Sequence, residues 1–467
     1  MGIFDKYTDK ELSLKLAYDI SLIGGKAYYV GGYVRDSYLG INNKDIDIEV
    51  YGVTADRLRN ILNKYGEVLE HGKSFGVFGI KGYDIDISIP RTERCTGSKH
   101  TDFDVTFDPF LSVEEGAKRR DLTINAMMYD IANDELVDPY NGKQDLDLGI
   151  IRYVNKETFI EDPLRVLRVA QFASRFNNMQ VSPDTIELCS TIDISTLSKE
   201  RVYTELEKAL MKSKQPSIFF NILKQMNQLN VWFPEVEQMI GVPQSSIHHQ
   251  EGDVYTHTML VIDNLATMYR DISDMPMALI LSGLCHDMGK IVATTITDDG
   301  VHSYNHEHEG LDLTFNCLHR ITRETKIINT VLNTVELHMR PHQLFNSKSK
   351  IKKTNKLFDD ATVPEDLIRL AHCDTLSAKK ENNLEKTLAT NELNFLLERY
   401  QRYLNCTKDN YIIGKDLING GCKPGKYFSE VLSLAHKLQL AEVPIEQAWP
   451  QVLGLAKKLE RKENIGI

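Results

Sequence analysis

The sequence predicts an α+β fold in which a small α/β part comes first and a longer, mostly helical part follows. Between about residues 25 and 150, short β-branched runs alternate between apolar and polar residues, which is typical of a sheet with helices packed on it. From about residue 155, apolar residues recur three and four positions apart, as in Val166, Val169, Ala170 and Ala173, which is typical of helices. At 467 residues the chain is long enough for about two to four domains.

The strands predicted in the first part span residues 27–30, 45–50, 77–80 and 83–89, with glycine turns between them. In the second part, the sequence predicts a helix over residues 161–176, a helical run that begins at residue 253 and another that ends within residues 284–290. Glycines at 420, 421 and 425 interrupt the last helical region. No internal repeat and no low-complexity tract is present in the sequence.

Composition excludes several classes of protein. With 42% hydrophobic and 26% charged residues, the chain is typical of a globular protein rather than a disordered or fibrous one. No stretch reaches the roughly 18 uncharged residues of a membrane span, and the charged N-terminus does not resemble a signal peptide, so we expect a cytoplasmic protein. The seven cysteines never form a C-x-x-C pair, which argues against a thiolate zinc site. The net charge of −11 leaves nucleic-acid binding open, because binding depends on local patches.

A glycine pair followed by an acidic strand forms the first candidate site. Gly31 and Gly32 lie between a strand and a helix start, where backbone N–H groups can approach a phosphate, and Arg35 adds a cation there. In the next strand, period-two alternation puts Asp45, Asp47 and Glu49 on one face. This face is either a solvated edge or a Mg²⁺ site, because hard cations take oxygen ligands. A later alternating strand supplies a third carboxylate, Asp86.

These segments resemble the class II nucleotidyltransferases, which comprise the tRNA CCA-adding enzymes and the related bacterial poly(A) polymerases. The resemblance rests on GGYVRD (31–36), DIDIEV (45–50), RRDLTINAMMYD (119–130) and EDPLRVLRVAQFASRF (161–176), and later segments extend it over the whole chain. It implies a nucleotidyltransferase head with a mixed sheet over residues 1–150 and a helical neck over 151–235. It further implies an HD domain over residues 236–385 and a tRNA-binding tail over 386–467.

Asp162 and Arg165 form the second candidate site. A carboxylate only accepts hydrogen bonds and a guanidinium only donates them, so this pair matches the amino donor and ring-nitrogen acceptor that cytosine and adenine share. Uracil and guanine carry a carbonyl in place of that amine. The alternative is a salt-bridged surface helix. The resemblance assigns base recognition to Asp162 and Arg165, and it implies nucleotide contacts for Gly32, Arg35, Arg119, Arg120, Asp121, Asn125 and Arg168.

Histidines and aspartates of the helical middle form the third candidate site. His257, the pair His286-Asp287 and Asp374 follow the order H…HD…D, which resembles the metal-binding signature of HD-domain phosphohydrolases. Imidazoles with carboxylates bind divalent transition metals such as Ni²⁺, Mn²⁺ or Co²⁺, and can also bind Mg²⁺. His306 and His338 lie between the signature residues as further candidates. Because all four signature residues are present, we expect a metal-competent site rather than a degenerate one.

The leading functional hypothesis is therefore an enzyme that adds C, C and A to tRNA 3′ ends from CTP and ATP, with Asp45 and Asp47 holding catalytic Mg²⁺ and Asp86 as the third acid. Alternatives within the family are a poly(A) polymerase or an enzyme adding only CC or only A. A different class would be a metal-dependent HD phosphohydrolase with a nucleotide-binding head. A non-enzymatic RNA-binding module has little support, because no RRM-type sequence occurs. The expected partners are tRNA, CTP and ATP, with no membrane, and the oligomeric state stays open.

Overall fold

The computed structural model describes residues 7–70, 76–95, 103–245, 249–380, 383–409 and 411–465. The chain divides into two compact units, Met1–Trp232 and Phe233–Ile467. None of the helices in these described segments combines the length and apolar character that crossing a membrane requires.

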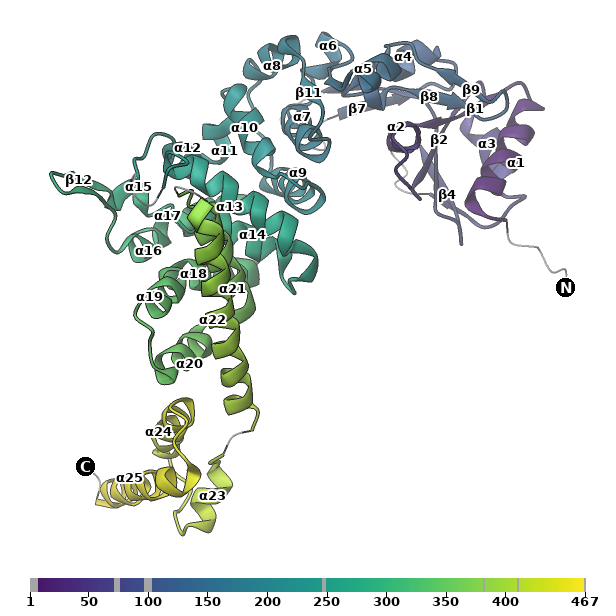
Figure 1. Ribbon diagram of the computed structural model, residues 1–467. Coiled ribbons are helices and arrows are strands. Elements are labelled where there is room, and N and C mark those ends of the chain that lie inside the picture. Colours follow the sequence, from purple (N-terminus) through teal and green to yellow (C-terminus); the bar gives the residue numbers. More distant parts are fainter. Residues whose placement is uncertain are drawn as a thin grey trace, which may run out of the picture. The chain divides into compact units, whose positions relative to one another are not determined.

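A seven-stranded mixed sheet forms the centre of the first unit (Figure 1). Its strand order is β3-β4-β5-β2-β1-β8-β9. The strands are β1 (Lys26–Val30), β2 (Ile46–Tyr51), β3 (Val68–Glu70), β4 (Val77–Ile80), β5 (Ile85–Ser88), β8 (Met128–Asp130) and β9 (Glu135–Val137). β2 and β5 pair in parallel, whereas the other pairs are antiparallel, which confirms the predicted mixed sheet. Ile46, Ile48 and Val50 of β2 are buried, as their alternation predicts.

Helices α1 (Asp9–Ser21) and α3 (Ala55–Leu62) pack beside this sheet, and α2 (Gly32–Tyr38) follows β1 directly. A capping box between Thr8 and Glu11 begins α1, and the helix buries Leu12, Leu16 and Ile20 at its sheet side. The strands β6 (Arg91–Cys95) and β7 (Phe103–Phe107) form a separate antiparallel ribbon. The remaining elements at this end of the chain are α4 (Val113–Lys118), η1 (Thr123–Asn125), α5 (Gly142–Leu148), β10 (Ile150–Ile151) and α6 (Lys156–Phe159).

A helical bundle completes the first unit. Its elements are α7 (Leu164–Arg175), β11 (Gln180–Val181), α8 (Pro183–Ser190), α9 (Lys199–Lys212), α10 (Ser217–Gln225) and α11 (Leu229–Trp232). α7 packs against both α9 and α10, and its apolar spacing buries Val166, Val169 and Ala170 completely. This packing leaves the polar side of α7 available to face a ligand.

The second unit is almost entirely helical, which agrees with the predicted change of pattern. Its central helix is α14 (Pro276–Cys285), every residue of which after Pro276 is buried. Three helices pack against α14, namely α13 (Val254–Met268), α18 (Thr325–Leu337) and α21 (Pro364–Ser377). Around them lie α12 (Pro234–Gln238), η2 (Arg270–Ile272), α15 (Lys290–Ala293), β12 (Thr295–Thr297), β13 (Gly300–His302), α16 (His306–Glu309), α17 (Leu311–Ile321), α19 (Met339–Asn346), α20 (Ile351–Asp360) and α22 (Leu384–Thr407).

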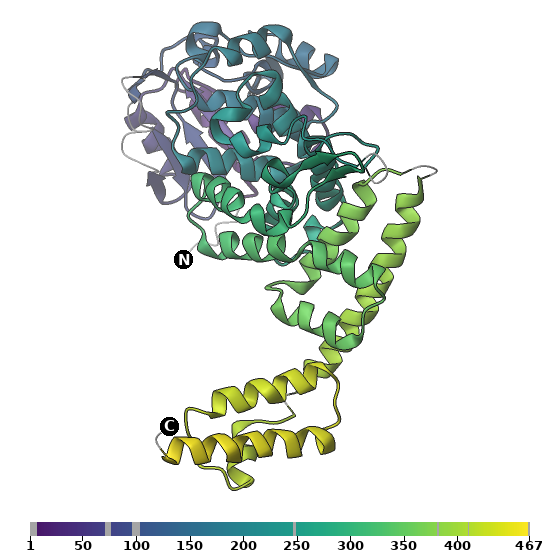
Figure 2. The same cartoon turned by 90° about the vertical axis from the view of Figure 1, so that its left-hand side faces the viewer.

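The last three helices have a small core of their own. They are α23 (Gly414–Asn419), α24 (Phe428–Leu440) and α25 (Ile445–Ile465), and Figure 2 shows α24 and α25 running side by side at the yellow end of the chain. Leu417, Val431 and Val452 are fully buried in this core. The C-terminal segment therefore packs as a local helical cluster.

Candidate functional site

The glycine turn after β1 brings the backbone close to a carboxylate and a guanidinium. Gly31 has φ +66°, a conformation that side chains with a Cβ rarely adopt. A Cβ there would lie 3.2 Å from Arg120 Nη1 and 3.8 Å from Asp47 Oδ2. Glycine therefore meets two demands at this position, the positive φ and the close approach of the acidic strand.

Three aspartates gather beside this turn. Asp47 lies within β2, Asp45 precedes the first residue of that strand, and Asp86 lies on β5 directly opposite Asp47 in the parallel register. Burial raises the pKa of Asp47 above its ordinary value, Arg120 lowers it, and the neighbouring charges of Asp86 and Asp45 raise it again. A cation bound between these carboxylates would remove this repulsion, so the donor set fits a hard divalent ion.

Glu49, on the same face of β2, has a different environment. It is fully buried, and its Oε1 accepts a hydrogen bond from Arg119 Nη2 at 2.6 Å, while its Oε2 lies 3.6 Å from Arg120 Nη2. Burial alone would raise the pKa of Glu49, but Arg120 and Arg119 hold it below its ordinary value. Glu49 therefore stays ionised and fixes both arginines, which excludes the solvated-edge interpretation for this part of the strand.

Asp121 links the sheet side of the site to α7. Its Oδ2 accepts hydrogen bonds from Arg168, with 2.7 Å to Nε, and its Oδ1 accepts one from Asn125 Nδ2 at 3.0 Å. Burial would raise the pKa of Asp121, but Arg168 and Asn125 lower it to about 2. Arg35 is also buried, and its guanidinium is satisfied there. It donates hydrogen bonds to Asp36 Oδ1 at 2.8 and 2.6 Å and to Asn125 Oδ1 at 2.5 Å.

The pair Asp162 and Arg165 lies at the start of α7. The helix begins at Leu164 rather than at residue 161, because Pro163 disfavours helical backbone in the residue before it. Asp162 instead accepts hydrogen bonds from Leu164 N at 3.1 Å and from Arg201 Nη2 at 2.9 Å. Arg165 donates to the Thr158 carbonyl at 2.7 Å and to the Arg119 carbonyl at 2.6 Å. Both side chains are thus held in place independently of each other.

One cavity of about 670 Å³ joins these groups. Its walls include Asp45, Asp47 and all ten residues expected to contact the nucleotide, whereas Asp86 is exposed on β5 and does not line the cavity. The ten are Gly31, Gly32, Arg35, Arg119, Arg120, Asp121, Asn125, Asp162, Arg165 and Arg168. Further cations in the walls are Arg91, Arg175, Lys208 and Lys212, and none of the last three was predicted from the sequence as a site residue. The cavity is strongly basic although the chain is acidic overall, which suits a triphosphate.

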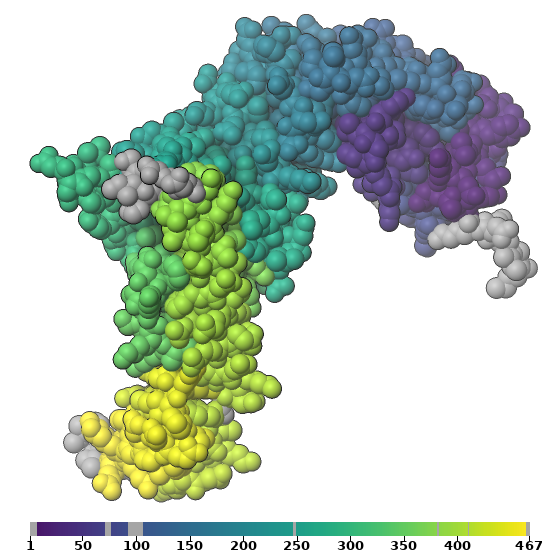
Figure 3. Space-filling view, in the orientation of Figure 1, coloured from purple at the N-terminus to yellow at the C-terminus, as the bar shows by residue number. Residues whose placement is uncertain are grey.

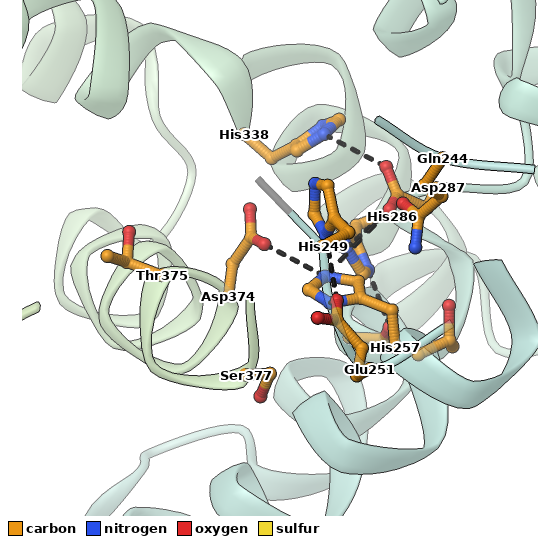
Figure 4. Close-up of polar contacts among 12 residues, drawn as sticks. Gln244, His249, Glu251, His257, His286, Asp287, His338, Asp374, Thr375 and Ser377 are labelled. Carbon is orange, nitrogen blue, oxygen red and sulfur yellow. Dashed lines mark hydrogen bonds and ion pairs between the residues drawn. The ribbon is translucent and has the colours of Figure 1, made fainter. Parts of the chain in front are cut away.

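In the second unit, the four residues of the H…HD…D pattern lie together (Figure 4). His257 Nε2 is 3.0 Å from Asp374 Oδ1 and 3.9 Å from Asp287 Oδ2, and His286 Nε2 is 3.3 Å from Asp287 Oδ2. One nitrogen of His257, one of His286 and a carboxylate oxygen of Asp374 all lie within 4.8 Å of one another, the spacing of ligands around a single ion. His286 Nε2 is buried and has no hydrogen-bond partner, which fits a metal ligand.

A second triad adjoins the first. Asp287, His306 and His338 are buried with ligand atoms within 4.8 Å of one another, and the Nε2 atoms of the two histidines face each other at 3.2 Å. His306 Nδ1 lies 2.8 Å from the Ser303 carbonyl and His338 Nδ1 lies 2.6 Å from the Val335 carbonyl. A carbonyl only accepts, so each Nδ1 carries a proton, which leaves Nε2 as the ring nitrogen that a metal would bind. The order of residues in the sequence predicted these two histidines only as further candidate ligands. It could not predict which groups accept the protons on their Nδ1 atoms.

Glu251 orients the signature histidine His257. Its Oε1 lies 2.8 Å from His257 Nδ1 and 2.7 Å from His249 Nδ1, and its Oε2 accepts a hydrogen bond from the Lys379 backbone N–H. Because the Glu251 carboxylate accepts the proton on His257 Nδ1, the other ring nitrogen, Nε2, is directed at Asp374, as Figure 4 shows. A cavity of about 610 Å³, with Asp287, His306 and Asp374 in its walls, gives a ligand access to both triads.

Three family models match the chain. The poly A polymerase head domain matches residues 27–152, the probable RNA and SrmB-binding site of polymerase A matches residues 178–240, and the HD domain matches residues 254–379. The chain is 37% identical over 340 residues to a multifunctional CCA protein of Mannheimia succiniciproducens, covering 71% of this chain and 79% of that protein.

Solved structures show the same fold. The CCA-adding enzyme of Bacillus stearothermophilus in complex with CTP has a TM-score of 0.64 at 18% identity, covering 98% of this chain and 100% of that one. The Thermotoga maritima CCA-adding enzyme complexed with tRNA has a TM-score of 0.60 at 21% identity, covering 96% of both chains. The α+β class with a nucleotidyltransferase head, predicted from the sequence, is thereby confirmed.

Proposed function

The chain belongs to the multifunctional CCA protein family, and we propose on this basis that it adds C, C and A to the 3′ ends of tRNA from CTP and ATP. The observation that carries the proposal is the basic cavity of about 670 Å³ in the first unit, where Asp45 and Asp47 share the walls with the base-reading pair Asp162 and Arg165. Such a cavity combines a metal centre for phosphoryl transfer with a protein surface that selects the base.

The head residues divide the reaction between them. Asp45 and Asp47 would hold Mg²⁺, which supplies charge neutralisation for the α-phosphate and the attacking and leaving oxygens when bound. Gly31 and Gly32 let the backbone approach the phosphates, and the cations Arg119, Arg120 and Arg168 offset the triphosphate charge. The tRNA 3′-hydroxyl attacks the α-phosphate, a new ester bond forms, and the bond to pyrophosphate breaks. Asp86, in register with Asp47, adds a third acidic charge beside the pair and so raises its demand for a cation.

Base selection follows from how Asp162 and Arg165 are fixed. The Asp162 carboxylate accepts the exocyclic amine of cytosine or adenine, and the Arg165 guanidinium donates to the adjacent ring nitrogen. Two backbone carbonyls and Arg201 hold these groups before the nucleotide arrives, which reduces the ordering cost of binding. Uracil and guanine would leave the Asp162 carboxylate facing a carbonyl oxygen, so they are rejected.

A second activity is favoured by the two ligand triads of the HD domain. His257, His286 and Asp374 offer one position for a divalent metal, and Asp287, His306 and His338 offer an adjoining one. A transition metal such as Ni²⁺, Mn²⁺ or Co²⁺, or alternatively Mg²⁺, would activate water for attack on a phosphate ester when bound. Glu251 and the backbone carbonyls keep the imidazoles in the ligating tautomer. The proposed activity is therefore metal-dependent phosphate-ester hydrolysis.

The direct test of the first activity uses tRNAs that lack the whole CCA end, its last two nucleotides, or only the final A. The purified protein should restore each end to CCA with CTP and ATP and should add neither UMP nor GMP. Runs of A on every substrate would instead identify a poly(A) polymerase. Completion of only one substrate would identify an enzyme that adds CC or A alone.

A further inference from the structure

Glu49 is a charged side chain of the first unit that takes no part in the reaction as proposed. It lies within β2, opposite Tyr28 of β1 on one side and Ser88 of β5 on the other, and its side chain is fully buried. It does not line the basic cavity, although Asp47, two residues earlier on the same strand, does. A buried carboxylate costs free energy unless cations and hydrogen bonds compensate for it, so its place in the sheet requires an explanation.

The carboxylate of Glu49 reaches two adjacent arginines of the cavity wall. Arg119 Nη2 lies 2.6 Å from Glu49 Oε1, and Arg120 Nη2 lies 3.6 Å from Glu49 Oε2. The Tyr51 hydroxyl donates a hydrogen bond to Glu49 Oε2 at 3.1 Å. Both arginine side chains are largely covered, and both line the cavity. One buried anion therefore anchors two cations that belong to the wall of the nucleotide site.

This anchor joins segments that are far apart in the sequence. The arginines follow α4, and Arg119 lies 70 positions after Glu49. Figure 3 shows the purple and blue segments of the first unit packed against each other. The backbone carbonyl of Arg119 accepts a hydrogen bond from Arg165 Nη2 at 2.6 Å, and this contact does not involve the Arg119 guanidinium. The base-reading pair and the two anchored guanidinium groups are therefore held by separate contacts.

Arg120 has a second carboxylate close by. A Cβ on Gly31 would lie 3.2 Å from Arg120 Nη1 and 3.8 Å from Asp47 Oδ2, so both groups lie beside the same glycine. A guanidinium released from Glu49 could pair with Asp47 instead, because ionised partners form the strongest hydrogen bonds. Such a pair would withdraw a cation from the phosphates and an oxygen from a metal ion. Glu49 thus keeps the neighbouring charges of the wall apart.

We propose that Glu49 is a positioning residue that holds Arg119 and Arg120 in the arrangement that binds the triphosphate of the incoming nucleotide. The proposal rests on the CCA-adding activity proposed above and adds to it a residue that lies outside the cavity wall. Because CTP and ATP carry the same triphosphate, loss of the Glu49 charge weakens the binding of both to the same extent. Discrimination against UTP and GTP stays as it is, since Asp162 and Arg165 have partners of their own.

The test measures binding of CTP, ATP and inorganic triphosphate to the full chain by titration calorimetry with Mg²⁺ and without tRNA. Glu49→Gln keeps the size of the side chain and can still bond to Arg119 and Tyr51, but it lacks the charge. It should raise Kd for all three ligands by the same factor, at least about fivefold. The matched control is Ser88→Ala, opposite Glu49 on β5 and outside the cavity wall, which should bind as the unmodified protein does.

Steady-state kinetics distinguish positioning from a general defect of the fold. In Glu49→Gln, KM for CTP and ATP should rise with Kd, whereas KM for tRNA and the ratio of CTP to UTP incorporation should not change. In a double-mutant cycle, Glu49→Gln should cost less affinity for CTP in the Arg119→Gln protein than in the unmodified one, because one of the two cations is already absent. Melting temperatures establish that each variant is folded.

An unchanged Kd for CTP in folded Glu49→Gln would overturn the inference, as would full additivity with Arg119→Gln or an equal rise in KM for tRNA. If Glu49→Gln alone does not fold, the double variant, which loses one charge of each sign, is compared with Arg119→Gln, and equal Kd values for CTP overturn the inference. If the unmodified protein binds CTP but adds no nucleotide, the proposed function fails and the binding data still decide this inference. If it binds neither CTP nor ATP, both fail.

Discussion

Asp47 lies directly opposite Asp86 in the parallel pairing of β2 with β5. Like charges placed directly across neighbouring strands destabilise a sheet unless something lies between or beside them. Here Arg120 supplies part of the compensation, and the remaining acidic charge fits a divalent cation. The head of the chain therefore keeps an electrostatic cost that metal binding would relieve, which is typical of a functional site.

Removing a metal ligand from this cluster should abolish nucleotide addition without unfolding the protein. We expect Asp45→Ala or Asp47→Ala to lower the rate of CTP and ATP incorporation into tRNA below detection, because transition-state charge is no longer neutralised. The loss of carboxylate repulsion should leave the melting temperature unchanged or slightly higher. Asp84→Ala is the matched control, since its exposed side chain does not line the cavity. Full activity of both ligand variants would exclude this head site.

Changing the base-reading pair should relax selectivity. With Asp162→Ala or Arg165→Ala, the correct base loses a partner, at a cost of roughly 1–3 kcal/mol in transition-state binding. The rate of CTP and ATP incorporation should fall. The ratio of this rate to the rate of UTP and GTP incorporation should fall as well. Arg201→Ala should produce a weaker form of the same defect, because Arg201 fixes the Asp162 carboxylate at 2.9 Å. Unaltered selectivity in all three variants would place base recognition elsewhere.

The pair of buried Asp121 and half-buried Arg168 should stabilise the head in a pH-dependent way. Because the folded protein holds the pKa of Asp121 at about 2 against an ordinary 3.8, the ionised carboxylate contributes roughly 2 kcal/mol to the free energy of unfolding. This contribution is fully present above about pH 4 and is lost as the pH falls through about 2. Urea unfolding of Asp121→Asn at pH 7 should show the loss. Equal unfolding free energies for the variant and the unmodified protein at pH 7 would contradict the pairing.

The sequence predicted the components of the head site better than their roles in the structure. Alternation in β2 correctly placed Asp45 and Asp47 together, since strand periodicity is local. The same alternation grouped Glu49 with them, yet Glu49 is buried against Arg119 and Arg120, about 70 positions later in the chain. Such a pairing depends on tertiary contacts that no local pattern encodes.

Two further features illustrate the same limit. The helix predicted over residues 161–176 begins three residues later, and the partner of Asp162 is Arg201 on α9 rather than Arg165. In the HD domain, the order of the signature residues predicted one group of ligands. The sequence left His306 and His338 as further candidates, and it could not predict that the carbonyls of Ser303 and Val335 orient them toward Asp287. The direction in which a ring nitrogen faces is a property of packing, not of spacing.

We expect this one chain to carry two chemically independent centres, and a crossed assay on single preparations of each variant tests this independence. Asp47→Ala and His286→Ala should each be assayed for CCA addition to tRNA and for metal-dependent hydrolysis of adenosine 2′-monophosphate, with the melting temperature of each preparation recorded. We expect Asp47→Ala to lose addition and retain hydrolysis, and His286→Ala to lose hydrolysis and retain addition near the unmodified rate, because each change removes a ligand from one centre only. Parallel loss of both activities in either variant at an unchanged melting temperature would contradict the claim.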